Sequence, residues 1–245
     1  MANEIEKVNG IAIADIEKIN GMTDANMEKV SGLEFTNQQF LTATGGTVST
    51  DGDYKVHKFT GDGTFTVTGL GADSTHGTKV RYLLVAGGGG AAIQSGGFGA
   101  PGAGGAGGYR VSTSDGYVYA VTAQAYAITV GTGGAGVAGN TGFAAGTKGS
   151  NSVINPTSGS TLTATGGGNA VNAGQDGGSG GGGAGSGFVG GSGNEGSYSP
   201  SEGNDGGEGE AYTDSGGAGG GGSGGGGADG SGTSGGAGGN ATAND

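Results

Sequence analysis

The sequence predicts a mainly β protein with short N-terminal strand-turn repeats, a small central β-sandwich or barrel-like domain, and a glycine-rich C-terminal region. Glycine supplies 69 of the 245 residues, far above the roughly 7% of ordinary soluble proteins. A short unit recurs near the N-terminus, and β-branched and aromatic residues alternate with polar ones in the middle of the chain. These observations place the boundaries of the three regions at residues 1–45, 46–165 and 166–245.

The N-terminal repeats begin at Ile5, Ile16 and Met27, with a period of 11 residues. Each unit combines apolar residues with Glu and Lys and then reaches Asn-Gly or Ser-Gly, of which Asn-Gly is a strong turn signal. An 11-residue period also fits a right-handed helical coil. A glycine in every unit would cost such a helix about 1 kcal/mol each time. We therefore predict strands and turns that stack on one another or on copies from other chains.

The central region contains the alternating patterns of β-strands. Residues 54–60 and 64–68 predict a hairpin around Gly61-Asp62-Gly63. Residues 80–86 form the most apolar run, which is short enough for a central strand. Further strands are predicted at 117–121, 126–130, 152–154 and 161–165. Most of the large apolar side chains fall in this region, so we expect the core here.

The C-terminal region consists of Gly, Ser and Ala tracts with scattered acidic residues, and no Lys or Arg follows Lys148. Such composition is typical of a flexible linker. It also fits a bundle of polyproline-II-type strands, which have no internal hydrogen bonds and must pair with their neighbours. Collagen is excluded because glycine does not recur strictly at every third position and proline is rare. The sequence does not decide between the linker and the bundle.

Charge and composition exclude several classes of function. The net charge is −12 and the basic residues are scattered singly, so we expect no nucleic acid as a partner. No stretch approaches the roughly 20 apolar residues of a membrane span, and the first residues lack the apolar run of a secretory signal. We therefore expect synthesis in a cytoplasm. With no cysteine, resistance to harsh surroundings would come from backbone hydrogen bonds or oligomerisation.

Signals of an enzyme are weak. Gly87, Gly89 and Ala92 fit the spacing of a dinucleotide-binding loop, but that mechanism needs a helix directly after the loop. The glycine-rich residues that follow are not expected to sustain one. His57 falls in a predicted strand and His76 in a predicted loop, without a cysteine nucleophile. We therefore predict that the protein is not an enzyme, with no catalytic residues and no cofactor.

Four acidic residues lie close together among glycines, at Glu202, Asp205, Glu208 and Glu210. Carboxylates in a tight loop could bind calcium. Their order matches neither the EF-hand loop nor the nonapeptide calcium repeat. We therefore predict solvated negative charge at these residues and no metal site.

Three aromatic residues stand out in the glycine-rich region: Phe188, Tyr198 and Tyr212. Aromatic rings held at loop tips could stack on sugar rings. They could equally anchor the glycine-rich chain locally. We take them as candidate contacts for a surface ligand.

The middle of the chain resembles the glycine-rich domain of phage and bacterial surface proteins. The resemblance covers about residues 54–170, and the matching segments are 56–60, 83–90, 104–110 and 126–136. The N-terminal units resemble the Ile-Glu-Lys-Ile-Asn-Gly arrays of virion proteins from marine and cyanobacterial phages. The C-terminal region is similar in composition to the polyglycine-helix adhesins at phage fibre tips.

The resemblance implies a virion structural protein of a tailed bacteriophage, such as a tail fibre, a head fibre or a capsid-surface protein. We expect a short fibre or fibre-tip protein that contributes to host-surface attachment, made in the host bacterial cytoplasm and located on the virion. Residues 1–45 would bind other virion proteins and set the oligomer, expected to be a homotrimer. A host glycan or protein would be the surface partner. The alternatives are a capsid decoration protein without a receptor role and a glycine-rich ice-binding protein.

Overall fold

The computed structural model describes residues 40–73, 76–94, 99–112, 119–137, 143–170, 172–212 and 215–242, together with short strands between residues 7 and 34. The described residues contain strands and no helix. Five of the strands form one antiparallel sheet in the order β19-β18-β16-β10-β7. These strands are β7 (Thr42–Thr44), β10 (Gly63–Gly69), β16 (Ala125–Thr129), β18 (Ser152–Pro156) and β19 (Leu162–Ala164). The mainly β class predicted from the sequence is confirmed.

Each N-terminal repeat contributes one antiparallel strand pair. The pairs are β1 (Lys7–Val8) with β2 (Ile11–Ala12), β3 (Lys18–Ile19) with β4 (Met22–Thr23), and β5 (Lys29–Val30) with β6 (Leu33–Glu34). The first strands of the pairs begin at residues 7, 18 and 29, so they keep the 11-residue period of the sequence. The strands exclude a helical coil for these residues.

The remaining described strands form separate antiparallel pairs. They are β8 (Thr47–Asp51) with β9 (Tyr54–Lys58), β11 (Lys79–Val80) with β15 (Tyr119–Ala120), β12 (Leu83–Val85) with β14 (Tyr109–Val111), and β13 (Ile93–Gln94) with β17 (Phe143–Ala144). The core follows the alternation of the strands: Tyr126 and Ile128 of β16 are buried and cluster with Val67 and Val121. A second buried cluster contains Leu84 and Leu162, so β12 packs near β19.

The predicted hairpin is wrong in its pairing. Both strands form, but β9 pairs with β8, whereas β10 pairs with β16 and β7. A two-residue loop, Gly52-Asp53, joins β8 to β9, and Gly52 has a φ of 54°. Two-residue hairpin loops favour positive φ, which glycine adopts without steric cost. The two-residue turn at Gly52-Asp53 is tighter than the predicted turn at residues 61–63, so β9 pairs with the strand before it, β8.

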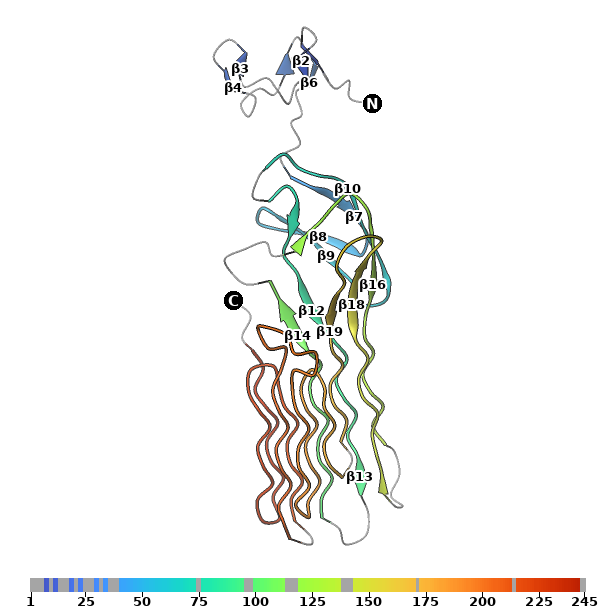
Figure 1. Ribbon diagram of the computed structural model, residues 1–245, viewed down its shortest axis with the longest axis vertical. Coiled ribbons are helices and arrows are strands. Elements are labelled where there is room, and N and C mark those ends of the chain that lie inside the picture. Colours follow the sequence, from blue (N-terminus) through green and yellow to red (C-terminus); the bar gives the residue numbers. More distant parts are fainter. Residues whose placement is uncertain are drawn as a thin grey trace.

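Below the sheet the chain forms a bundle of extended glycine-rich segments, which we call the glycine array (Figure 1). Several strands of the β domain run directly into it, so the array draws on both the central and the C-terminal regions of the sequence. The array comprises residues 86–92, 99–108, 130–137, 145–151, 165–170, 172–178, 179–185, 188–195, 201–210, 215–222, 225–231 and 234–242.

Hydrogen bonds in the array repeat every three residues. The N–H groups of Ala100, Ala103 and Ala106 all donate to carbonyl groups of segment 215–222, over N···O distances of 2.7 to 3.1 Å. Three residues per turn is the repeat of the polyproline II helix, whose backbone makes no hydrogen bonds within its own strand. This repeat is the one expected of a polyproline-II-type bundle, and the array extends over the C-terminal region for which the sequence allowed a bundle or a linker.

Segment 179–185 lies at the centre of the array, because it is hydrogen-bonded to six neighbouring segments. It donates N–H groups to three of them and accepts N–H groups from the other three. The six neighbours are residues 99–108, 172–178, 201–210, 165–170, 188–195 and 215–222. Such packing leaves no room for side chains at its glycines: a Cβ atom added at Gly180 or Gly183 would overlap a neighbouring backbone carbonyl. Close approach of the backbones explains the glycine content.

Tyr119 gives the β domain an expected dependence on alkaline pH. Its ring lies edge-on to Tyr126 with centroids 6.2 Å apart. Burial of the ring raises the pKa of Tyr119, and the nearby Tyr126 raises it further. The unfolded chain therefore loses this proton at a lower pH than the folded chain. The stability that this group contributes is fully present below about pH 10, the ordinary tyrosine value, and is lost as pH rises through the raised folded pKa.

We expect Tyr119→Phe to reduce the loss of stability at alkaline pH. Urea unfolding of both chains on either side of about pH 10 would measure this. At neutral pH the variant should lose only the hydrogen bond that the Tyr119 hydroxyl donates to the Ser160 carbonyl, at 3.1 Å. An equal alkaline loss in both chains would assign the effect to another group.

Candidate functional site

Phe188 and Tyr212 lie at the end of the glycine array that is far from the sheet. The N–H of Gly209 donates to the carbonyl of Phe188, and the N–H of Gly187 donates to that of Glu210, both at 2.9 Å. These bonds hold the two turns side by side. Tyr212 is 74% exposed, whereas Phe188 is half-buried. Among the described residues, Tyr212 therefore presents an exposed aromatic ring at this end.

Tyr198 lies at the opposite end of the array, next to β14. The guanidinium carbon of Arg110 lies over its ring, 3.9 Å from the centroid. The side chain of Asn194 bonds to both the N–H and the carbonyl of Tyr198, each at 3.0 Å. The structure therefore separates Tyr198 from Phe188 and Tyr212, and it stacks the Tyr198 ring against a side chain of the same molecule.

The residues considered for enzyme chemistry lie in structural positions. Nδ1 of His57 is 2.8 Å from the carbonyl oxygen of Gly45, and His76 pairs with Asp73 at 3.1 Å. The glycine run after β12 continues as an extended segment of the array, with the N–H of Gly87 donating to the Ser150 carbonyl at 3.0 Å. The helix that a dinucleotide-binding loop requires does not form at residues 87–92.

The acidic residues serve the array as hydrogen-bond acceptors. Asp205 accepts the N–H of Gly193 at 2.7 Å, and Asp229 accepts the N–H of Glu208 at 2.8 Å. At an outer segment no further backbone is present to accept these donors, so a side-chain carboxylate replaces it. Among the described residues, no three His, Cys, Asp or Glu side chains gather closely enough to hold a metal ion.

The prediction of solvated charge is wrong for Glu202, which is fully buried with 0% of its surface exposed. One carboxylate oxygen of Glu202 accepts the N–H of Thr165 at 2.8 Å. The backbone carbonyl of Glu202 also accepts the N–H of Tyr109 at 2.8 Å. The carboxylate lies where the array meets the β domain, where it satisfies a backbone donor that no segment of the array reaches. No local sequence signal separates Glu202 from the exposed acids around it.

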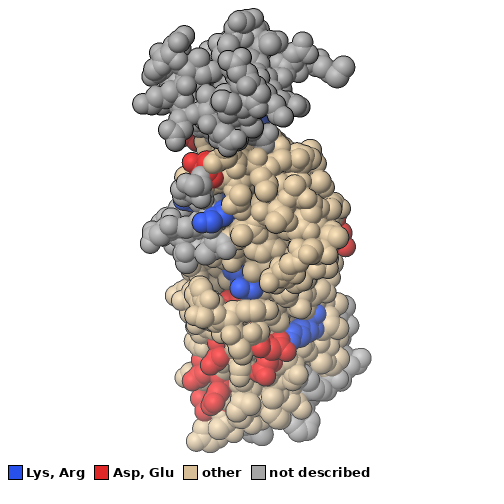
Figure 2. All heavy atoms as spheres, turned by 45° about the horizontal axis from the view of Figure 1, so that its top comes forward, with Lys and Arg blue, Asp and Glu red and all other residues tan. Residues whose placement is uncertain are grey.

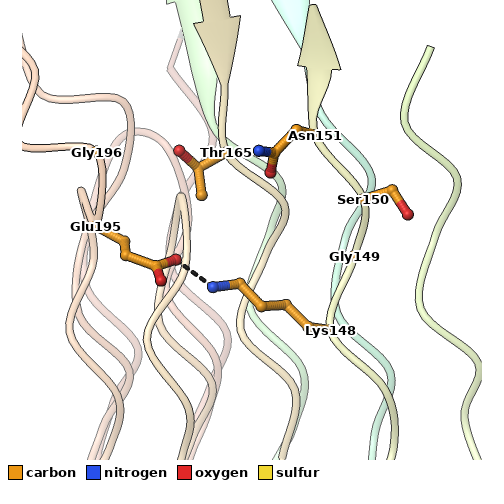
Figure 3. A pocket seen from close by; sticks show the side chains of 7 residues that line it. All are labelled: Lys148, Gly149, Ser150, Asn151, Thr165, Glu195 and Gly196. Atoms are coloured by element: carbon orange, nitrogen blue, oxygen red, sulfur yellow. Dashed lines mark hydrogen bonds and ion pairs between the residues drawn. The ribbon is translucent and has the colours of Figure 1, made fainter. Parts of the chain in front are cut away.

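A groove opens on the side of the molecule where the array meets the β domain (Figure 3). Its volume is about 650 Å³, and it is lined by Lys148, Gly149, Ser150, Asn151, Thr165, Glu195 and Gly196. Residues 148–151 precede β18, and Thr165 directly follows β19. Lys148 reaches across the groove to form an ion pair with Glu195 (Figure 3). The pair joins array segments that are 47 residues apart in the sequence, so sequence reasoning could not find the groove.

The polar groups of the groove differ in what they offer. The amide oxygen of Asn151 accepts the N–H of Gly166 at 2.9 Å, and its amide nitrogen donates to no other described residue. The hydroxyl of Thr165 makes no hydrogen bond with another described residue. Ser150 turns away from the ion pair (Figure 3), and its hydroxyl lies 3.4 Å from that of Thr132. The groove therefore presents an ammonium, a carboxylate, an amide and a hydroxyl group.

Acidic side chains gather over the lower part of the molecule, which the glycine array forms, with a basic group directly beside them (Figure 2). The uneven distribution follows from the sequence, because no Lys or Arg follows Lys148. A ligand at this end therefore meets a negative potential. The described part of the chain has no helix long and apolar enough to cross a membrane.

Comparison with known proteins gives one match. No curated protein and no solved structure is significantly similar to the chain. The family model of the glycine-rich domain matches residues 60–245. This range begins just before β10 and includes most of the five-stranded sheet and all of the glycine array. The chain belongs to the family of glycine-rich domain proteins.

Proposed function

We propose that this protein is a structural protein of a phage virion, specifically a short fibre or fibre-tip protein that contributes to attachment to the host surface. The glycine array carries the proposal. Ordering glycine costs more conformational entropy than ordering any other residue. In the array, backbone hydrogen bonds from each segment to neighbours on several sides offset that cost without disulfides or a large core. Such a backbone-bonded body suits a particle that must persist outside the cell, because proteases cut most readily where the backbone is exposed and not hydrogen-bonded.

The arrangement along the molecule also supports this function. The described chain enters the β domain at residue 40, and the array turns after residues 185 and 210 lie at the other end of the β domain and array (Figure 1). The N-terminal repeats would bind other virion proteins and form a homotrimer, in which copies of a repeat complete one another's packing. The exposed end near Tyr212 would then face a host glycan or protein. A capsid decoration protein would use the same body without that contact.

One observation favours an ice-binding protein as a second candidate. Ala100, Ala103 and Ala106 are all exposed, and they follow one another at the three-residue repeat of the array. This repeat places their methyl groups in a rank with a spacing of about 9 Å. Thermal hysteresis of the purified chain would distinguish this candidate, since a fibre protein has no reason to produce it.

Deletion of residues 1–39 is expected to abolish incorporation into phage particles. The deletion ends before β7, so the five-stranded sheet keeps all of its strands. Blotting of purified particles for a tagged chain would measure incorporation, with the tagged full chain as the control. The thermal unfolding temperature of the shortened chain would show that the rest remains folded. Absence of the full chain from particles would overturn the virion proposal, and retention of the shortened chain would overturn attachment through the repeats.

A further inference from the structure

We propose that the groove between Lys148 and Glu195 binds a neutral polyhydroxylated ligand, a glycan of one or two sugar rings. The proposal rests on the attachment function proposed above and names the chemical class of its ligand. It adds a second contact beside the β domain, separate from the exposed Tyr212 at the far end of the array. Three properties of the groove support it: fixed walls, unused hydrogen-bonding groups and a balanced charge.

The walls of the groove are held by backbone hydrogen bonds on both sides. The N–H of Gly149 donates to the Gly167 carbonyl at 3.0 Å, and the N–H of Ser150 donates to the Thr132 carbonyl at 2.9 Å. On the other side, the N–H of Glu195 donates to the Gly177 carbonyl at 3.0 Å. The polar side chains therefore project from a backbone that needs no ordering when a ligand binds. Preorganisation of this kind reduces the entropic cost of binding.

The hydrogen-bonding groups of the groove match a ligand rich in hydroxyl groups. The Lys148 ammonium has three donors and uses one for Glu195, as Figure 3 shows. The amide nitrogen of Asn151 is a further donor, and the Thr165 hydroxyl can both donate and accept. The second carboxylate oxygen of Glu195 accepts. Sugar hydroxyls both donate and accept, so such a mixed set can satisfy several of them at once.

The charge and lining of the groove exclude other ligand classes. The ion pair is neutral as a unit, and the chain around it carries a net charge of −12, so phosphate and acidic sugars are repelled. The lining set contains no aliphatic or aromatic side chain, which disfavours an apolar ligand because such ligands bind mainly apolar pockets. The groove has a volume of about 650 Å³ and is open to solvent, so a bound ligand keeps part of its hydration, as a sugar can. Of these ligand classes, a neutral sugar fits the groove best.

Saturation-transfer NMR on the full chain would test the proposal. The probes are neutral sugars at millimolar concentration, namely glucose, galactose, mannose, rhamnose, N-acetylglucosamine and lactose, with glucuronate and inorganic phosphate as charged competitors. We expect at least one neutral sugar to bind and the charged probes not to bind. Glu195→Ala should weaken that binding at least about tenfold, because a charged hydrogen-bond acceptor is lost. Asp229→Ala is the matched control and should leave binding unchanged, because it also removes a hydrogen-bonded carboxylate from the array but lies outside the groove.

A second variant separates ligand contact from folding. The double exchange Lys148→Glu with Glu195→Lys keeps an ion pair across the groove but reverses its direction. It should unfold at the same temperature as the natural chain and lose the sugar. Binding of no neutral sugar, binding that survives both variants, or preferential binding of glucuronate or phosphate would overturn the proposal. A chain that enters particles but binds no sugar overturns this inference alone, whereas a chain that binds sugar but is absent from particles overturns the virion function.

Discussion

Gly183→Ala is expected to lower the free energy of unfolding by about 3 kcal/mol, at the upper end of the usual cost of overpacking. Gly183 lies in the central segment of the array, and an added Cβ would overlap the carbonyl of Phe188. The backbone cannot shift to relieve this overlap. The N–H of Gly183 donates to the Gly207 carbonyl at 3.0 Å, and its own carbonyl accepts the N–H of Ala218 at 2.8 Å. Equilibrium urea unfolding of the full chain would measure the loss.

Gly133→Ala provides the matched control on an outer segment of the array. The nearest atom to an added Cβ there is the carbonyl oxygen of Gly88, at 3.8 Å, which is an ordinary contact. We expect a change within about 0.5 kcal/mol or a small gain, because alanine restricts the unfolded chain more than glycine does. An equal decrease in the free energy of unfolding at Gly133 and Gly183 would show that close packing does not explain the need for glycine.

Glu202→Ala is expected to destabilise the protein by about 3 kcal/mol, because it leaves a buried hydrogen-bond donor without an acceptor and creates a cavity. The carboxylate is fully buried, and one of its oxygens accepts the N–H of Thr165 at 2.8 Å. Thr165 directly follows β19, so the lost bond lies at the junction of the sheet and the array. Thermal and urea unfolding should both show the loss.

Two variants define the origin of that effect. Glu202→Gln keeps an oxygen that can accept the Thr165 N–H and removes the charge, so it should restore most of the stability. Asp205→Ala removes an exposed acceptor, whose partner Gly193 can bond to water instead, and should cost about 1 kcal/mol. If Glu202→Ala costs no more than Asp205→Ala, the buried acceptor has no special importance.

The sequence predicts the β elements well where side chains alternate. The expected strand at 126–130 forms as β16 (Ala125–Thr129), and Tyr126 and Ile128 are buried as the alternation requires. The apolar run 80–86 is also extended, but it divides into β11 and β12 around Arg81 and Tyr82. When one face of a strand is buried, every second residue is apolar, and this alternation can be recognised within a few residues of sequence.

The array and the groove could not be predicted in the same way. Glycine has no side chain to mark which neighbour it faces, so segments 172–178 and 215–222 look alike although they occupy different positions in the array. The three-residue repeat is visible only in the hydrogen bonds between segments that are distant in the sequence. The same limit hides Glu202 and the Lys148–Glu195 pair, because each depends on which segments the array brings together.

The continuity of the sheet strands with the glycine array has a mechanical consequence. Residues 86–92, 99–108, 130–137, 145–151 and 165–170 each adjoin a strand of the β domain, so covalent chain crosses the junction several times. A pulling force between the two ends would therefore be shared among parallel load paths. A single peptide linker would carry the whole load in series and would extend first. The junction should accordingly yield by shearing many hydrogen bonds at once, at a force well above that needed to stretch a glycine linker.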